Sequence, residues 1–412
     1  MQIQEIGRNA RQASLELGLV SSTAKNDALN AIAQALRKNQ DFILEANQKD
    51  MEAAKKKGSS TPFLDRLMLN SDRLEGMAVS LEEIAMLKDP IGEVTGGWKL
   101  ANGLRINRVR VALGVIGIIY EARPNVTVEA FGLCLKAANA SILRGGSLSL
   151  HSNKALIDVI NQASEGKIPQ NSVQLITDTS HEVAEEFMSL KELDILIPRG
   201  GEELIKLVTE KAKVPVLWAA AGNCHTYVDK DACIEMALKI VINAKTQRPG
   251  VCNAMETLLV HEDIAGQFLP KAIEALKAKD VEIRGDSKVK AIDGSVKDAT
   301  EQDYYTEYED LILAVKVVSS NQEAIEHINK YGTLHSEAII TKNYFAARKF
   351  TAGVDAACVY VNASTRFTDG FEFGFGGEIG INTQKLHFRG PMGLEALTST
   401  KYIIEGNGQI RE

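Results

Sequence analysis

One cysteine stands where a nucleophile could work. The stretch KTQRPGVCNAMETLLV, residues 245–260, places Cys252 just after Pro249 and Gly250 and before a run of strand-forming residues. Proline and glycine end the preceding helix, so the sequence predicts that the thiol lies on a turn, where a thiolate can attack an acyl carbon. A free cysteine is also among the most buried residue types and often only fills a core. Spacing alone leaves both interpretations open.

Attack on an acyl carbon also requires a hydrogen-bond donor for the oxyanion, commonly a side-chain amide together with a backbone N–H. Asn125, in EARPNV at residues 121–126, is a candidate because it follows a buried strand. From spacing alone, an ordinary turn residue beside proline is the favoured interpretation. A thiol could also pair with a histidine, and the candidates are His225, His335 and His387. For each of them, a purely structural role is at least as plausible. The sequence shows no metal-ligand cluster and no glycosidase-like carboxylate pair.

Two loops combine arginine with glycine after a short strand and before a predicted helix. They are the Arg144, Gly145, Gly146, Ser147 loop and the Arg199, Gly200, Gly201 loop. Such loops can bind phosphate, because glycine lets an anion approach the backbone, a helix N-terminus offers N–H groups and arginine adds charge. Tight turns with arginine facing water are the better interpretation of any one loop. Two loops of the same kind modestly favour a nucleotide site.

Alternating helix-like and strand-like segments must position these residues. The first hundred residues read as helices, one capped by Ser22 and one beginning with Thr61 as cap. The segment around 104–110 alternates like a strand exposed on one face, and 115–120 is a continuous apolar run typical of a strand buried on both faces. Short apolar runs spaced by helices follow, which predicts a parallel α/β sheet. They lie at 140–143, 173–176, 195–197 and 214–217, with a second series at 226–228, 257–260, 311–313, 337–340 and 357–361.

Composition limits the class of protein. The 412 residues, with 45% hydrophobic and 25% charged side chains, are typical of a globular chain of two or three domains. A net charge of −7 argues against a nucleic-acid-binding surface. Five scattered cysteines do not form the spacing of a zinc site or a disulfide framework, and Cys134 and Cys233 fit helical core patterns. No secretory signal or membrane span is visible, so we expect a cytoplasmic protein.

Long motifs in a fixed order carry a resemblance over nearly the whole chain. They are YEARPNVT at 120–127, ILRGGS at 142–147, GNCH at 222–225, AKTQRP at 244–249, VCNAME at 251–256, YG at 331–332, HSE at 335–337, NASTRFTDG at 362–370, EIG at 378–380, TQKLH at 383–387 and RGPMG at 389–393. With these motifs, the sequence resembles the gamma-glutamyl phosphate reductases, a branch of the aldehyde dehydrogenase superfamily.

The resemblance implies a function. It is the NADPH-dependent reduction of L-glutamyl 5-phosphate to glutamate 5-semialdehyde and phosphate, in proline biosynthesis. Cys252 matches the nucleophile that forms a thioester, and Asn125 matches the oxyanion asparagine. The Arg144 and Arg199 loops and Glu378 match the cofactor site. Four cations in matched motifs are expected to bind the substrate's anionic groups: Arg123, Lys245, Arg248 and Arg366.

The resemblance also implies an aldehyde-dehydrogenase-like α/β fold. Residues 1–222 would form a Rossmann-like NADPH-binding domain that includes an oligomerisation strand at about 101–112. Residues 223–362 would form the catalytic domain, and 363–412 would return to the cofactor domain and end in an oligomerisation arm. The arm would pair the strand near 104–110, as an exposed edge, with residues 397–410. A homo-oligomer is therefore expected, and association with glutamate 5-kinase is plausible because acyl phosphates are labile.

The sequence departs from its relatives at a few positions. Trp218 to Ala221 replace a Glu-Thr-Gly stretch, and Leu148 replaces an acidic residue that contacts the cofactor ribose or its 2′-phosphate. A reductase that delivers hydride to a thioester needs no water-activating glutamate, so the first change is compatible with reduction. Two other interpretations stay open: an enzyme that reduces a different acyl group, such as an acyl-CoA, and a non-catalytic nucleotide-binding relative.

Overall fold

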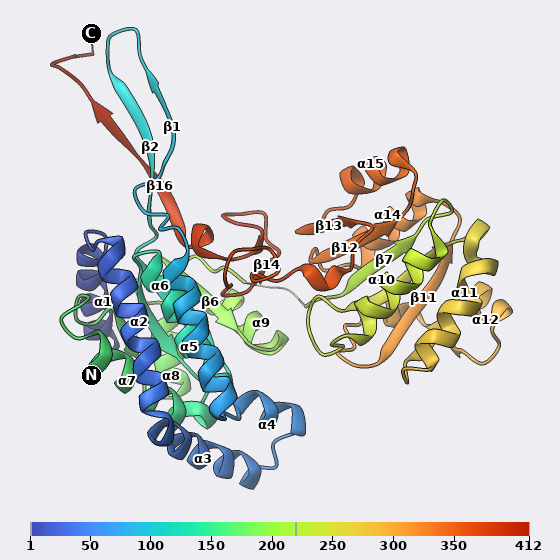
Figure 1. Cartoon of the computed structure of the whole chain (residues 1–412), viewed down its shortest axis with the longest axis horizontal. Helices are drawn as coiled ribbons and strands as arrows, with labels where there is room; N and C mark the ends of the chain where they lie inside the picture. Colours follow the sequence, from blue (N-terminus) through green and yellow to red (C-terminus); the bar gives the residue numbers. More distant parts are fainter. Residues whose placement is uncertain (1, 219–220, 412) are drawn as a thin grey trace. The chain divides into compact units, whose positions relative to one another are not determined.

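The computed structural model describes residues 2–218 and 221–411. The chain divides into two compact units, coloured along the sequence in Figure 1. Of the described residues, unit 1 comprises 2–218, Gly374–Gly380 and 392–411. Unit 2 comprises 221–373 and Ile381–Pro391. The expected return to the first domain at 363 differs from this division, because residues 363–373 and 381–391 pack within unit 2.

A four-stranded parallel sheet forms the centre of unit 1. Its strands, in the order β5-β4-β3-β6, are β5 (Val173–Leu175), β4 (Ala140–Arg144), β3 (Val115–Tyr120) and β6 (Ile195–Arg199). The continuous apolar run of β3 is buried at every residue, as its sequence predicts. In place of the strand expected at 214–217, the structure has a single parallel bridge between Leu196 and Val216. The carboxyl ends of β3, β4 and β6 therefore lie at one edge, where parallel sheets bind ligands.

Helices cover this sheet. They are α1 (Ile3–Leu17), α2 (Ser22–Lys38), α3 (Gln40–Lys56), α4 (Thr61–Leu67), α5 (Ser71–Met86), α6 (Pro124–Lys136), α7 (Leu150–Ser164), α8 (His181–Met188) and α9 (Glu202–Lys211), with short 3-10 turns η1 (Ser147–Ser149) and η3 (Leu394–Leu397). Helix α1 contacts the strands and α8, whereas α2 packs against α5, α6 and α7. The predicted helix starts are each wrong by one residue. Ser21, not Ser22, caps α2 by accepting from the N–H of Ala24, and Ser60 rather than Thr61 precedes α4.

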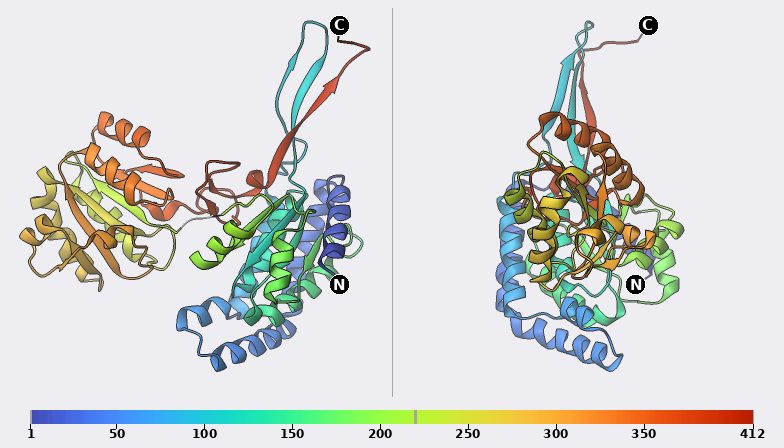
Figure 2. Two further views of the ribbon diagram at one scale, coloured as in Figure 1. Left: turned by 180° about the vertical axis from the view of Figure 1, so that it is seen from behind. Right: turned by 90° about the vertical axis from the view of Figure 1, so that its right-hand side faces the viewer.

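An antiparallel arm projects from unit 1, as all the views in Figures 1 and 2 show. Its strands lie in the order β1 (Val94–Lys99), β2 (Arg105–Ala112) and β16 (Thr398–Glu405). The predicted pairing of the two distant segments is confirmed, because Thr398 to Glu405 pair with Ala112 to Arg105. The prediction that the strand near residue 104 is an edge is wrong. Strand β2 is the middle strand, and β1 and β16 are the edges.

Unit 2 is built on a seven-stranded parallel sheet in the order β10-β9-β11-β8-β7-β12-β13. The strands are β7 (Cys224–Val228), β8 (Met255–His261), β9 (Glu282–Gly285), β10 (Lys297–Asp298), β11 (Ile312–Val318), β12 (Ser336–Ile340) and β13 (Cys358–Val361). The other elements are α10 (Ile234–Thr246), α11 (Glu262–Lys277), α12 (Ser287–Ile292), α13 (Glu301–Tyr305), α14 (Asn321–Tyr331), α15 (Tyr344–Gly353), η2 (Thr365–Phe367) and the hairpin β14 (Ile381–Asn382) and β15 (Gly390–Pro391). Every pairing within the seven-stranded sheet is parallel, as the predicted second series requires.

The two cysteines that are predicted to lie in helical cores differ in burial. Cys134 lies in the core of α6, as predicted, and burial raises the pKa of its thiol above the usual value. The core prediction for Cys233 is wrong, because this residue is only half-buried and is the N-cap of α10.

Within the described residues, no helix combines the length and apolarity that crossing a bilayer requires.

Helix α6 begins with the segment that carries Asn125, and a glycine permits its packing. A Cβ on Gly132 would lie 2.6 Å from Leu81 Cδ2 of α5. We expect Gly132→Val to destabilise the protein by roughly 1–3 kcal/mol, because buried overpacking forces side chains from their preferred positions. Gly76→Val is the matched control, since Gly76 is exposed on α5 with no heavy atom within 4 Å of its Cβ position. Thermal unfolding followed by circular dichroism would test this, and equal midpoints for the two variants would contradict it.

Candidate active site

Cys252 lies on the turn between α10 and β8, half-buried, as its sequence context predicts. Two hydrogen bonds fasten this turn to the segment around η2. The hydroxyl of Thr365 donates to the carbonyl of Asn253 at 2.7 Å, and Nδ2 of Asn253 donates to the carbonyl of Thr368 at 2.9 Å. The turn that presents the thiol is therefore held from the side of η2.

The start of β7 holds the same turn from the side of its carbonyl group. A Cβ on Gly222 would lie 1.7 Å from the carbonyl oxygen of Cys252, so only glycine fits this approach. The thiol of Cys224 contacts the same oxygen at 3.1 Å. Burial is the largest cause that raises the pKa of Cys224 well above its usual value, so this thiol stays protonated and can donate. Cys224 is therefore a buried thiol that supports the turn.

The guanidinium of Arg366 lies within electrostatic range of both Arg248 and Cys252. Burial is the main cause that lowers the pKa of Arg366, and the charge of Arg248 lowers it further, whereas Cys252 and Asp369 act in the opposite sense. Arg366 is half-buried on η2, where its Nε donates to Oε1 of Gln247 at 2.9 Å. A bound anion would relieve the repulsion between the two cations. A nearby cation also favours the thiolate form of a cysteine.

Lys245 occupies a different environment from the one predicted. Its ammonium lies 2.5 Å from Oε2 of Glu256, and both side chains are fully buried. Burial lowers the pKa of Lys245 and raises that of Glu256, while their contact opposes both shifts. The predicted contact of Lys245 with substrate is therefore replaced by a structural ion pair, because a cation without exposed surface cannot meet a ligand.

Two of the predicted histidines, His225 and His335, have structural partners within unit 2. Nδ1 of His225 lies 3.0 Å from Oε2 of Glu337, and both residues are buried. His335 lies beside Ser336 Oγ at 2.8 Å, and burial lowers the pKa of its imidazole to about 4. His335 is therefore neutral near pH 7, and its neighbouring thiol is Cys224, at 3.7 Å. These contacts agree with the structural interpretation of both histidines.

Asn125 lies in the first turn of α6, which begins at Pro124 directly after β3. Its Nδ2 lies 3.3 and 3.2 Å from Oε1 and Oε2 of Glu129. Burial raises the pKa of Glu129, and the hydrogen bond from Asn125 and the charges of Arg199 and Arg123 oppose that rise. Sequence reasoning missed Glu129, although residues four apart on a helix face one another and this spacing is visible in the sequence.

The Arg144 loop follows β4, as predicted, but its charges already have partners. The guanidinium of Arg144 donates from Nη2 to the carbonyls of Thr179 and Ser180, at 3.0 and 2.9 Å. At the start of α7, the buried carboxylate of Asp50 accepts from the N–H groups of His151 and Ser152, at 3.2 and 2.8 Å. The expectation that this helix N-terminus offers unbound N–H groups is therefore wrong for these two amides.

The Arg199 loop follows β6 and contacts a second carboxylate, that of Glu121. Oε2 of Glu121 accepts from the N–H of Gly201 at 3.1 Å, at the N-cap of α9. A Cβ on Gly200 would lie 2.8 Å from Cδ of Glu121, and one on Gly146 would lie 3.6 Å from its Cα. Glu121 therefore joins both glycine loops to the end of β3.

The same edge includes part of the returning segment. A Cβ on Gly380 would lie 2.5 Å from Nη1 of Arg199, which places Gly380 against the guanidinium, two residues after Glu378. Beside Gly201 the space is open, with no heavy atom within 4 Å of its Cβ position, and Ser147 is exposed. These residues fit a dinucleotide at the carboxyl edge of an open sheet, but not one whose phosphates rest on the capped amides of His151, Ser152 and Gly201.

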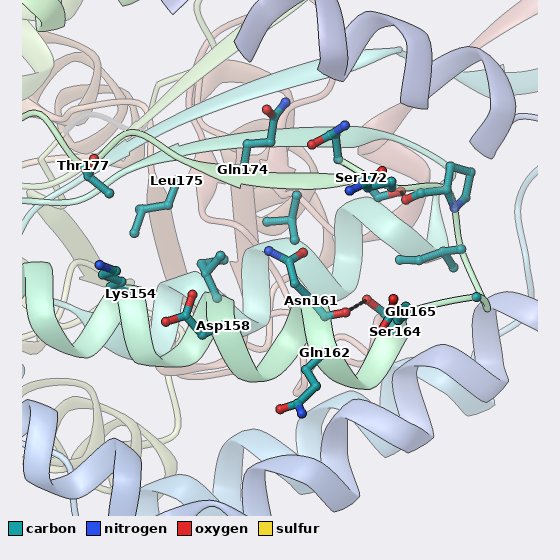
Figure 3. Close-up of a pocket in the computed structure, with 17 residues that line it drawn as sticks. Lys154, Asp158, Asn161, Gln162, Ser164, Glu165, Ser172, Gln174, Leu175 and Thr177 are labelled. Atoms are coloured by element: carbon teal, nitrogen blue, oxygen red, sulfur yellow. Dashed lines mark hydrogen bonds between the residues drawn. The ribbon is translucent and has the colours of Figure 1, made fainter. Parts of the chain in front are cut away.

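Other features of the described chain lie outside these predictions. A pocket of about 830 Å³ lies along α7 and β5, and its lining, drawn as sticks in Figure 3, includes none of the predicted site residues. Among the described residues, no three His, Cys, Asp or Glu side chains gather as a metal site. Within the segment Trp218 to Ala221, Ala219 and Ala220 lie outside the described residues. Directly after it, the N–H of Gly222 donates to Oε1 of Glu307 at 2.8 Å, a carboxylate that sequence reasoning missed.

Comparisons with known proteins identify the family. The aldehyde dehydrogenase family matches residues 1–310. A gamma-glutamyl phosphate reductase of Moorella thermoacetica is 58% identical over 414 residues, covering 100% of this chain and 99% of its relative. The crystal structure of gamma-glutamyl phosphate reductase from Thermotoga maritima is 50% identical, with a TM-score of 0.98 and 100% of both chains covered. The chain belongs to the gamma-glutamyl phosphate reductase branch of the aldehyde dehydrogenase family.

Members of this branch are oxidoreductases, and the predicted aldehyde-dehydrogenase-like α/β fold is confirmed. An acetylating aldehyde dehydrogenase from Geobacillus thermoglucosidasius has a TM-score of 0.70 at 16% identity, over 100% of this chain and 97% of its own, and shows the same fold.

The contact between Gly222 and Cys252 yields a sharp test. Gly222→Ala must push the turn away from β7, and a displacement of about 1 Å can reduce catalysis on the order of 10²-fold. We expect at least that loss of reductase activity, together with a lower thermal midpoint. Gly250→Ala is the control, because the nearest atom to its Cβ position is the carbonyl oxygen of Glu309 at 3.5 Å, an ordinary contact. An active Gly222→Ala enzyme would refute the assigned constraint.

Proposed function

We propose that the chain catalyses the NADPH-dependent reduction of L-glutamyl 5-phosphate to L-glutamate 5-semialdehyde with release of phosphate, the second step of proline biosynthesis. Full-length relatives named for this reduction support the substrate. Within the structure, the main support is the presented thiol of Cys252 together with the guanidinium groups of Arg366 and Arg248. A nucleophile beside an anion site suits an acyl phosphate, because the carbon attacked carries the phosphate that leaves.

The first chemical step forms a thioester on Cys252. The thiolate attacks the carbonyl carbon, a C–S bond forms, and the C–O bond to phosphate breaks. Phosphate is a good leaving group, so little acid assistance is required, and Arg366 and Arg248 stabilise its charge. The side-chain amide of Asn125 and the N–H of Cys252 are proposed to stabilise the oxyanion.

The second step is reduction of the thioester. When bound, NADPH supplies a hydride to the thioester carbon. The C–S bond then breaks, so the Cys252 thiolate is regenerated and the aldehyde is released. We assign the cofactor to the Arg144–Ser147 and Arg199–Gly201 loops and to Glu378, and Arg123 to the substrate's anionic groups. The preference for NADPH rests on the family resemblance.

The arm supports a homo-oligomer. Its exposed apolar side chains include Trp98, Tyr402, Ile403 and Ile404, of which Ile404 is 59% exposed. Apolar residues on unpaired edge strands favour pairing with another chain. We therefore propose that the edge strands β1 and β16 contact a second copy of the chain. Association with glutamate 5-kinase stays a prediction.

Replacing the nucleophile tests the mechanism. We expect Cys252→Ala to abolish oxidation of NADPH with L-glutamyl 5-phosphate, because no thioester can form, while the thermal midpoint changes little. Cys233→Ala is the control, since this half-buried cysteine belongs to the cap of α10. Turnover by Cys252→Ala would exclude the assigned nucleophile. A preference of the unmodified enzyme for CoA thioesters would instead exclude the proposed substrate.

The anion site has its own readout in the reverse reaction, in which phosphate is a substrate. Hydrogen bonds to a charged group contribute about 1.5–3 kcal/mol, which corresponds to a roughly 10- to 100-fold change in affinity. We expect Arg366→Ala to raise the KM for inorganic phosphate by that factor. Arg348→Ala, an exposed arginine on α15, should leave this KM unchanged. An unchanged KM in Arg366→Ala would place the phosphate elsewhere.

A further inference from the structure

The environment of Asn125 suggests a role for a residue that no sequence motif singles out. Glu129 lies one helical turn after Asn125 on the same face of α6, and both its carboxylate oxygens face Nδ2 of Asn125, at 3.3 and 3.2 Å. An amide nitrogen carries two N–H groups. When the carboxylate accepts from this nitrogen, the plane of the amide is fixed, and one N–H can serve an oxyanion.

The backbone beneath this pair is closely packed. Val128 and Ala130, on either side of Glu129, are 0% and 2% exposed, and Gly132 packs α6 closely against α5. The carboxylate therefore projects from a rigid position. An oxyanion donor is effective when it is held in place before the reaction, because no reorganisation is then required as charge develops.

A carboxylate beside an oxyanion site is electrostatically unfavourable, because like charges repel, and nearby cations offset this repulsion. Burial raises the pKa of Glu129, which disfavours its charge, and the guanidinium groups of Arg199 and Arg123 are the cations that act on it. Both arginines belong to segments that we assign to ligands. The negative charge of Glu129 is thus balanced within the same edge of unit 1.

We propose that Glu129 is a positioning residue that orients the Asn125 amide as the oxyanion donor. This inference rests on the proposed function, in which Asn125 stabilises the oxyanion. Glu129 touches the donor, not the reacting atoms. Its contribution must therefore disappear when Asn125 is removed, which a general effect on folding would not do.

A double-mutant cycle tests this in the full-length enzyme, with kcat and KM measured for the semialdehyde, phosphate and NADP⁺. We expect Asn125→Ala to lower kcat on the order of 10²- to 10³-fold, as loss of one oxyanion donor does. Glu129→Leu, which keeps bulk but removes the acceptor, should lower kcat about 10-fold or more with KM values nearly unchanged. Glu129→Gln, which keeps an acceptor oxygen, should stay within about 3-fold of the unmodified enzyme. The double variant Glu129→Leu/Asn125→Ala should be no slower than Asn125→Ala alone.

Opposite results separate the two levels of the proposal. Unmodified kcat in Glu129→Leu, or a double variant slowed by the product of the two single effects, would overturn the role of Glu129. Full activity of Asn125→Ala would overturn the proposed function of Asn125 itself. If Glu129→Leu lowers the thermal midpoint, Glu129→Asp replaces it in the cycle, because the shorter side chain keeps the charge but withdraws the acceptor. The same outcomes then apply.

Discussion

The approach of the Gly222 backbone to the carbonyl of Cys252 is the contact on which the rest of unit 2's site depends. A Cβ would stand 1.7 Å from that oxygen, so the two segments can meet only without a side chain. Parallel pairing of β7 with β8, in which Cys224 faces Met255, brings them together, and the register shifts directly after this pair. Both strands lie in the interior of the seven-stranded sheet. The turn that carries the thiol is therefore anchored to a close-packed core.

Two cations of unit 2 show how burial divides structural from binding roles. Lys245 is fully buried against Glu256, and removing one partner of such a pair typically costs about 3–5 kcal/mol, because the other charge is left without compensation. Arg366 keeps part of its surface, and the charge of a second guanidinium, Arg248, acts on it in addition to the carboxylate of Asp369. An arrangement that leaves like charges facing each other stores unfavourable energy, which an anionic ligand can release. The motif AKTQRP at 244–249 thus contains Lys245, which stabilises the fold, and Arg248, which is suited to a ligand.

Much of the fold could be predicted because its signals are local. The buried run of β3, the turn before β8 and the alternation of helices with parallel strands follow from hydrophobic period and from proline and glycine. Strands β9 and β10 were not predicted, since four- and two-residue strands containing charged side chains lack such a pattern. The partners of Lys245 and Arg144 also depend on tertiary contacts. The sequence of a matched motif does not show whether the ammonium of its lysine faces solvent or contacts a buried carboxylate. In Lys245 it contacts the carboxylate of a residue eleven positions away.

The capped helix N-termini of unit 1 are the feature that sequence reasoning was least able to anticipate. Asp50 reaches α7 from a helix about a hundred residues earlier in the chain, and Glu121 reaches Gly201 from the end of a neighbouring strand. A phosphate that approached the N–H of Gly201 would meet this carboxylate first, so a dinucleotide at this edge would have to be held by side chains and by the open flank of the loop. Glu121 also packs against Gly146 and Gly200. Its backbone adjoins Gly146, whereas its carboxylate adjoins Gly200 and accepts from Gly201, so one residue at the end of β3 links the two loops.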